Sequence, residues 1–518
     1  MSGTHEKERC CPAAVHKEVI GESRSLCPVC LAALPARIIQ EGDAVCIRRS
    51  CPEHGEFSGL IWKGQPEFTT WKRPKKASLS VRRETRTTKG CPHDCGRCPE
   101  HGQHACTVLF EITEQCNLRC PVCFADAGQS AVTAVSGTED CGKNQFASLE
   151  ELVEQLHWIA EHAGKVVLQI SGGEPTLYPR LPELVRVART LFPAVQLNTN
   201  GLLLADRPEL APALKNAGLS WVFLQFDGSN DSIFTVLRGR PLLRQKLAAV
   251  ENCRVAGLNV VLVPTVAAGV NDQDLGNLLR LALSLAPTVR GLHLQPMTRS
   301  GRNALSHEES TLTLPEVLRA LCNQSEGLMR LEHATAPGCE HERCSFHCRY
   351  RLTPSGGLVP LRGESACCPS GEESETAPLK NSHACCPPVN DSGIACCDET
   401  ANVPDNDPTL GGAQRAIDVI LRAWQGPEHT TAAETGTSDA SGKVDAFDAF
   451  IAKARMQTFS VTCMAFQDAW NVDLERLKGC CVHVYAPPDR LVPFCAYNMT
   501  ALNGTRLHRG KSGFAARG

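Results

Sequence analysis

The chain has 518 residues, of which 42% are hydrophobic and 21% charged, enough for a large core with one or two accessory modules. A net charge of −3 provides no overall basic surface for nucleic acid, and no apolar run reaches the roughly 18 residues that a membrane span requires. The polar N-terminal residues 1–9 lack the apolar core of a signal peptide, which favours a cytoplasmic protein.

The cysteine content is unusual for such a protein, because the chain contains 29 cysteines and most of them fall in tight groups. In a long chain without a signal peptide this pattern favours metal or cluster ligation. The alternative is a secreted disulfide scaffold, but such scaffolds are usually short.

Residues 1–90 are expected to form a first unit, a cysteine module followed by a basic linker. A Cys-Pro-Val-Cys motif is followed about fifteen residues later by a second pair of cysteines, a spacing that suits a tetrahedral site of four sulfurs for zinc or a single iron. The predicted ligands of this rubredoxin-like site are Cys27, Cys30, Cys46 and Cys51.

Residues 91–300 are expected to form the second unit, and they open with another cysteine group. Its spacing is C-x3-C-x2-C-x7-C, which could supply all four ligands of a closed auxiliary iron–sulfur cluster. The predicted ligands are Cys91, Cys95, Cys98 and Cys106.

The rest of this unit alternates strand and helix signals, which predicts α/β structure with a parallel sheet. Six strands suit an open, partial (β/α)6 barrel of the TIM type better than a closed eight-stranded one, although a doubly wound sheet has the same periodicity. The strands are expected at 107–112, 166–170, 195–198, 221–226, 260–264 and 291–295, and the helices at 148–159, 180–192, 207–217, 241–256 and 274–285.

The cysteines Cys116, Cys120 and Cys123 directly follow the first of these strands with the spacing C-x3-C-x2-C, and Phe124 comes next. Three thiolates can bind three irons of a cubane cluster and leave the fourth iron open to another ligand. A zinc site without a visible fourth ligand is the alternative. We therefore expect these cysteines to be both metal ligands and catalytic residues.

Polar residues and glycines follow the next three strands, where parallel strands place their binding sites. Two glycines allow close approach of the backbone, and a glutamate can accept from an ammonium group. Each motif alone is a common turn. The expected cofactor-binding residues are Phe124, Gly172, Gly173, Glu174, Pro175, Asn198, Asn200, Gln225 and Asp227.

Taken together, these motifs resemble the radical S-adenosylmethionine (SAM) superfamily. The resemblance implies that the amino and carboxylate groups of SAM chelate the open iron of a [4Fe–4S] cluster, and that an electron from the cluster cleaves SAM to a 5′-deoxyadenosyl radical. It also implies that Glu174 binds the amino group of SAM. A small electron donor such as a flavodoxin or ferredoxin would be a partner.

The order of the cysteine groups resembles one multi-cluster subfamily, which includes the archaeal tetraether lipid synthase and proposed pterin methylases. Residues 301–362 and 446–518 would then form a C-terminal extension and a cap that bind a further cluster. The stretch Val482–Phe494 is expected to be a hairpin, and Cys481 and Cys495 at its ends are the predicted ligands. Structural cysteines in a packed cap are the alternative.

Residues 363–445 are rich in small and polar side chains, which predicts a largely disordered insertion. It carries three vicinal cysteine pairs, which we interpret as having no specific function. The expected activity is C–C bond formation or methylation at an unactivated carbon of a lipid-like or pterin-like small molecule. A radical SAM peptide maturase is the alternative enzyme, and a zinc-scaffold binding module is the alternative without catalysis.

Overall fold

The computed structural model describes residues 17–73, 85–128, 146–305, 311–353, 356–361, 417, 421 and 458–510. The expected disordered insertion at 363–445, with its vicinal cysteine pairs, therefore lies outside the described residues except for Ile417 and Leu421.

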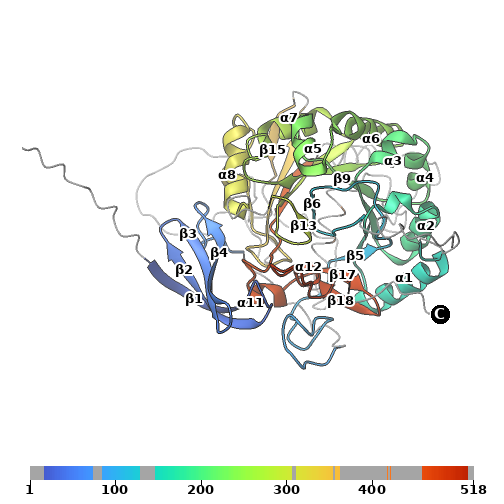
Figure 1. Ribbon diagram of the computed structural model, residues 1–518. Coiled ribbons are helices and arrows are strands. Elements are labelled where there is room, and N and C mark those ends of the chain that lie inside the picture. The colour runs from blue at the N-terminus through green and yellow to red at the C-terminus, as the bar shows by residue number, and fades with distance from the viewer. Residues whose placement is uncertain are drawn as a thin grey trace, which may run out of the picture.

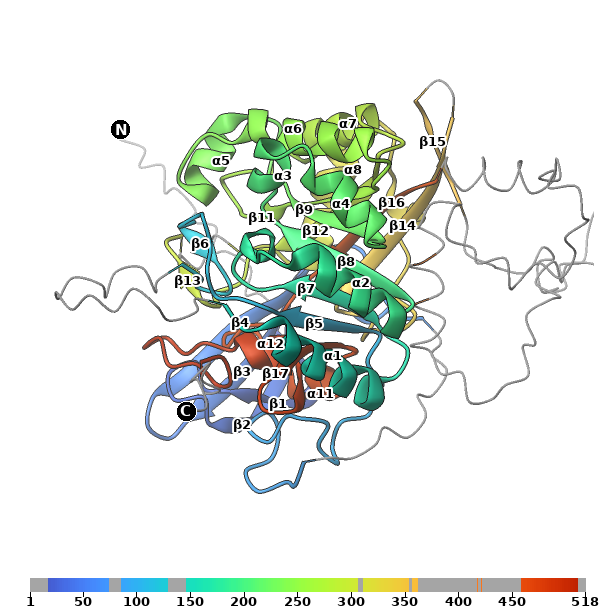
Figure 2. The same ribbon diagram turned by 90° about the vertical axis from the view of Figure 1, so that its right-hand side faces the viewer.

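A curled, mainly parallel sheet surrounded by helices forms the centre of the molecule (Figures 1 and 2). Six of its strands confirm the six predicted ones and pair in parallel in the order β5-β7-β8-β9-β10-β12. They are β5 (Thr107–Glu111), β7 (Val167–Ser171), β8 (Ala194–Thr199), β9 (Trp221–Gln225), β10 (Val260–Val263) and β12 (Val289–Pro296).

The five predicted helices are also present, and they cover the outside of this sheet (Figure 1). They are α1 (Leu149–Ala163), α2 (Leu181–Leu191), α4 (Leu210–Asn216), α6 (Leu243–Val255) and α7 (Leu275–Ser284). The capping box that opens α1 is formed as expected between Ser148 and Glu151. The barrel helices α3 (Leu202–Asp206) and α5 (Asp231–Arg238) were not among the predicted elements, and α8 (Leu314–Gln324) lies in the expected C-terminal extension.

The C-terminal segments add strands to both edges of the six-stranded sheet, which the sequence did not indicate. β16 (Thr458–Met464) pairs in parallel with β12, and β17 (Val482–Ala486) pairs in parallel with β5. The expected hairpin is present, because β18 (Arg490–Pro493) runs antiparallel to β17. At the other edge, β14 (Ser345–Leu352) and β15 (Leu358–Pro360) continue the sheet in antiparallel fashion.

The N-terminal module is a separate antiparallel sheet of β1 (Lys17–Leu26), β2 (Ala33–Glu41), β3 (Ala44–Cys51) and β4 (Gly55–Lys63). It lies beside the barrel, against the C-terminal segment that contains α11 (Leu474–Lys478) (Figure 1). The Ser25 hydroxyl donates to the Val472 carbonyl at 2.6 Å, and the Arg49 guanidinium donates to the Ala469 carbonyl at 2.9 Å. Among the described helices, none has the length and apolar character needed to cross a bilayer.

Candidate active site

The cysteines Cys116, Cys120 and Cys123 lie together at the carboxyl end of β5, on the wall of a cavity of about 300 Å³ inside the curled sheet. Cys120 is buried, and the other two are partly exposed. Burial raises the pKa of Cys116 to about 12, so this thiol needs a bound cation to become a thiolate ligand at neutral pH.

Two arginines, the buried Arg238 and the partly exposed Arg302, donate hydrogen bonds to the backbone of this cysteine loop. The Arg302 guanidinium donates to the Cys120 carbonyl at 2.7 Å, and the Arg238 guanidinium donates to the Val122 carbonyl at 2.9 Å. The short strand β6 (Val122–Cys123) also pairs with β13 (Arg302–Asn303). The loop is thus held in one conformation before any cofactor binds, which is what a rigid cluster site requires.

The two glycines after β7 pack closely against the backbone of the cysteine loop, and their contact with the cofactor stays a prediction. A Cβ at Gly172 would lie 2.3 Å from the Thr113 carbonyl oxygen, and a Cβ at Gly173 would lie 2.2 Å from the Gln115 carbonyl oxygen. Gly172 also has a positive φ of 126°. These glycines are therefore required for the close packing of this loop against the backbone that leads into Cys116, and both line the cavity.

Glu174 is completely buried and joins the ends of β7 and β8. Its carboxylate accepts hydrogen bonds from the Thr176 amide and hydroxyl, from the Thr199 hydroxyl at 2.6 Å and from the Asn200 amide at 2.7 Å. These donors occupy most of the acceptor sites of a carboxylate. The structure therefore places Glu174 as the buried support of the cavity floor, and its contact with SAM stays a prediction. Pro175 is buried at the start of the 3-10 helix η1 (Pro175–Leu177).

Asp227 forms a fully buried ion pair with Arg238, a residue that the sequence analysis missed. The Nε and Nη2 atoms of Arg238 donate to the Asp227 carboxylate at 2.7 and 2.6 Å, respectively. The Asp227 side chain is 0% exposed and the Arg238 side chain 7%. Arg238 lines the cavity and also holds the cysteine loop. Asp227 thus positions Arg238, and its expected contact with the cofactor stays a prediction.

Lys246 on α6 is a second buried cation that the sequence analysis missed. Its ammonium donates to the Asn200 carbonyl at 2.5 Å and to the Gln225 amide oxygen at 2.9 Å, so it ties the ends of β8 and β9 together. Burial lowers the pKa of Lys246 to about 7. The Asn200 amide nitrogen in turn donates to the Asn117 side chain in the cysteine loop at 2.7 Å.

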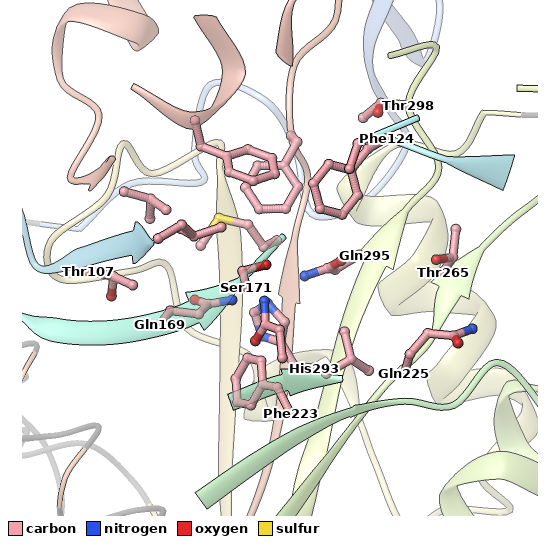
Figure 3. A pocket seen from close by; sticks show the side chains of 18 of the residues that line it. Thr107, Phe124, Gln169, Ser171, Phe223, Gln225, Thr265, His293, Gln295 and Thr298 are labelled. Carbon is pink, nitrogen blue, oxygen red and sulfur yellow. The ribbon is translucent and has the colours of Figure 1, made fainter. Parts of the chain in front are cut away.

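The cavity continues from the cysteines into the interior of the curled sheet, where polar side chains line it. Gln169, Ser171, His293 and Gln295 converge there (Figure 3), and Asn198 and Gln225 lie on the same wall. Burial lowers the pKa of His293 to about 3, and its Nδ1 lies 2.8 Å from the Thr462 hydroxyl. Its imidazole is therefore neutral and can both donate and accept a hydrogen bond.

Aromatic rings close one side of this cavity. The Phe124 ring lies 5.5 Å from that of Phe494, which lies 4.2 Å from that of Phe466. All three residues line the cavity, and the latter two come from the C-terminal segment. Phe124, expected near the cofactor, is thus part of an apolar wall that limits access of water to the cysteine loop.

At the N-terminal site the structure brings together a different set of side chains from the predicted ligands. Ligand atoms of Cys27, Cys30, Cys51 and His54 all lie within 4.8 Å of one another, whereas Cys46 is not in this group. Side chains alternate along β3, and its buried residues are Val45, Ile47, Arg49 and Cys51. Cys46 is therefore on the opposite face. The alternation of side chains between the two faces of a strand could have revealed this from the sequence. His54, in the turn after β3, is the fourth member of the group.

This assignment predicts a clear difference between two cysteine variants. Cys51→Ser is expected to lose one metal ion per chain, because it removes a ligand from a closed four-ligand site. Cys46→Ser is the matched control on the same strand and is expected to keep the metal. Metal analysis of both purified proteins tests this, and loss of metal from both variants would restore the four-cysteine site.

The remaining cysteines are also grouped differently from the prediction. A hydrogen bond between the thiols of Cys91 and Cys95 lowers the pKa of Cys91 and raises that of Cys95. The negative charge of Cys98 also raises the pKa of Cys95. The fourth predicted member, Cys106, instead lies with Cys481, their sulfurs 3.1 Å apart.

The structure groups Cys481 with other cysteines than Cys495, and the hairpin between the two is present as predicted. Cys481 belongs to a compact group with Cys106 and Cys339. The Cys495 sulfur accepts from the Gln467 amide at 3.3 Å, and the nearby Cys344 sulfur accepts from Arg476 at 3.3 Å. Cys481 directly precedes β17, which pairs with β5, whereas Cys495 lies in the first turn of the next helix, α12 (Phe494–Asn498).

Comparison with known proteins identifies this arrangement. Residues 110–282 match the model of the radical SAM superfamily, and residues 19–63 match the HMPTM N-terminal zinc ribbon domain. The 7,8-dihydro-6-hydroxymethylpterin dimethyltransferase of Methanocaldococcus jannaschii is 32% identical over 92% of this chain and 92% of its own length. The GTP 3′,8-cyclase of Paenarthrobacter nicotinovorans is 30% identical over 52% of this chain and 71% of its own length.

Among solved structures, SuiB of Streptococcus suis bound to its precursor peptide SuiA aligns with a TM-score of 0.34 and 13% identity, over 43% of this chain and 46% of that one. The full-length similarity to the dimethyltransferase establishes the family. The cysteine loop and the glycine-rich loop that packs against it fit a [4Fe–4S] cluster and SAM in one cavity. The chain therefore belongs to the radical SAM superfamily, and within it to the family of multi-cluster enzymes that contains the pterin dimethyltransferase.

Proposed function

We propose that this enzyme methylates a reduced pterin at an unactivated carbon. The observation that carries the proposal is the similarity to the pterin dimethyltransferase, which extends over 92% of both chains. A lipid-like substrate, as in the tetraether lipid synthase, is less well supported, because the relative that is similar over 92% of both chains is named for a pterin.

The cavity supports this choice through its chemistry. When bound, the cluster supplies the electron that cleaves SAM to a 5′-deoxyadenosyl radical. A pterin presents an edge of alternating hydrogen-bond donors and acceptors, and Gln169, Gln295 and the neutral His293 offer both kinds of partner inside the cavity (Figure 3). The Phe124, Phe466 and Phe494 rings would exclude water from the reacting atoms.

The direct test is an anaerobic reaction of the reconstituted enzyme with SAM, dithionite and 7,8-dihydro-6-hydroxymethylpterin. We expect 5′-deoxyadenosine together with a pterin product heavier by one or two methylene units in mass spectrometry. SAM cleavage without any change in the pterin would show that the substrate is wrong while the radical chemistry is right.

We propose further that Glu174 supports SAM binding. Glu174→Ala is expected to weaken SAM affinity by about 1.5–3 kcal/mol, because the proposed charge-assisted hydrogen bond from the SAM ammonium to this carboxylate is lost. The exposed Glu183→Ala on α2 is the control. Calorimetric titration with SAM measures the effect, while iron content should stay at the wild-type value. Unchanged SAM affinity would contradict the role.

The proposed reaction also needs an electron donor, and a cytoplasmic flavodoxin or ferredoxin is the expected partner. Reduction of the enzyme by such a protein in place of dithionite is the corresponding assay.

A further inference from the structure

A nearly buried ion pair beside the cysteine loop has no part in the chemistry described above. Glu111 is the last residue of β5, and Arg509 belongs to the C-terminal segment; their side chains are 13% and 10% exposed. We propose that the positive charge of Arg509 raises the reduction potential of the cluster held by the loop. Glu111 holds the arginine in place and offsets part of its charge.

Three acceptor atoms fix the Arg509 guanidinium in one orientation. Its two terminal nitrogens donate to the two carboxylate oxygens of Glu111 at 3.0 and 2.6 Å. Its Nε atom donates to the Asn498 side-chain oxygen at 3.0 Å. A planar guanidinium that binds a carboxylate through two parallel hydrogen bonds loses its rotational freedom. The charge of Arg509 is therefore held at a defined position.

This position is next to a predicted cluster ligand but outside the cavity. The Cζ atom of Arg509 lies 6.0 Å from the centre of the Phe124 ring and 4.8 Å from that of Tyr497. Phe124 directly follows Cys123 and lines the cavity (Figure 3). Neither Arg509 nor Glu111 is among the described residues that line it. Arg509 can thus act on the cluster through its charge, without touching SAM.

The C-terminal segment that carries Arg509 is attached to the cysteine loop at a second point. Arg506 forms an ion pair with Asp126, three residues after Cys123. The Arg509 amide also donates to the Tyr497 carbonyl at 3.2 Å, which ties the segment to α12. These contacts keep the distance between the arginine and the loop constant, as a steady electrostatic effect requires.

Arg509 remains charged in this environment. Burial opposes the charge, but the Glu111 carboxylate outweighs it and raises the pKa of Arg509 above its ordinary value, with a further contribution from Cys123. Reduction of a [4Fe–4S] cluster adds one electron and increases its negative charge by one. A cation close by stabilises the reduced form more than the oxidised one, and solvent screens this attraction little where side chains are buried.

The two members of the pair should shift the potential in opposite directions. Arg509→Met removes the cation and leaves the carboxylate, so we expect a more negative midpoint potential. Glu111→Gln removes the carboxylate and keeps an amide oxygen to accept from Arg509, so we expect a more positive one. Arg509→Lys retains the charge and should stay near the wild-type value. The double variant Glu111→Gln/Arg509→Met should lie between the two single variants.

The experiment is an anaerobic redox titration of the reconstituted full-length enzyme with dithionite, without SAM or pterin. Electron paramagnetic resonance follows the signal of the reduced cluster. The component that belongs to the radical site is the one missing from the Cys116→Ala/Cys120→Ala/Cys123→Ala variant, and iron analysis shows whether each variant retains its clusters. Arg180→Met, which breaks the exposed ion pair with Glu183 on α2, is the control and should leave the potential unchanged.

Unchanged potentials, or shifts of Arg509→Met and Glu111→Gln in the same direction, would overturn the proposal, since loss of packing alone has no opposite signs. If Arg509→Met loses iron, Glu111→Gln decides by itself, because it leaves Arg509 in place: a positive shift supports the proposal and an unchanged potential contradicts it.

The proposal also depends on the cysteine loop as the cluster site. A wild-type spectrum from the variant without the three cysteines would overturn both assignments together. Because the titration contains no pterin, failure of the proposed substrate leaves its result unaffected.

Discussion

Replacement of Cys116, Cys120 and Cys123 by alanine is expected to abolish formation of 5′-deoxyadenosine from SAM. The three thiols line the cavity at the carboxyl end of β5 and are the expected ligands of the cluster. Without them SAM has no open iron to chelate and no electron source, so the product should fall below detection by liquid chromatography.

The control for this experiment is Cys253→Ala, which removes a buried thiol on α6 and should retain SAM cleavage. The triad variant should also keep the ribbon metal at Cys27, Cys30, Cys51 and His54, since that site is in a separate sheet. Undiminished SAM cleavage by the triad variant would rule out the assignment of the radical site.

The second large effect is expected from the buried ion pair between Asp227 and Arg238. Asp227→Ala leaves a buried guanidinium without its counter-ion, and such changes lower the free energy of unfolding by about 3–5 kcal/mol. Because Arg238 also donates to the Val122 carbonyl, we expect the variant to lose iron from the cysteine loop as well. Anaerobic urea unfolding, followed by tryptophan fluorescence, and iron analysis measure the two effects.

A double variant separates the charge effect from the loss of packing. Asp227→Ala/Arg238→Met removes both charges and should regain part of the lost stability, because no unpaired charge remains buried. Glu251→Ala, which breaks the exposed pair of Glu251 with Arg254, is the surface control and should leave the unfolding midpoint unchanged. If Asp227→Ala also left the midpoint unchanged, the buried pair would not support the loop.

The sequence by itself determined the elements of the barrel and the position of the radical site. Each apolar run and each helix cap is a local pattern, so the six inner strands and the capping box at Ser148 could be located within a few residues. The cysteines of the radical site lie within eight consecutive residues, 116–123, and their spacing alone specifies the loop. The hairpin 482–494 was predictable for the same reason.

Only the tertiary structure decided which distant groups meet. The pairing of β17 with β5 places Cys481 beside Cys106, although 375 positions separate them in the sequence. The local spacing of cysteines cannot predict this strand pairing. Arg238 and Lys246 are on helices whose sequences look like ordinary surface patterns, and only packing against the strand ends buries their charges. Local spacing reports what a short segment can bind, whereas strand order and burial determine which segments share a site.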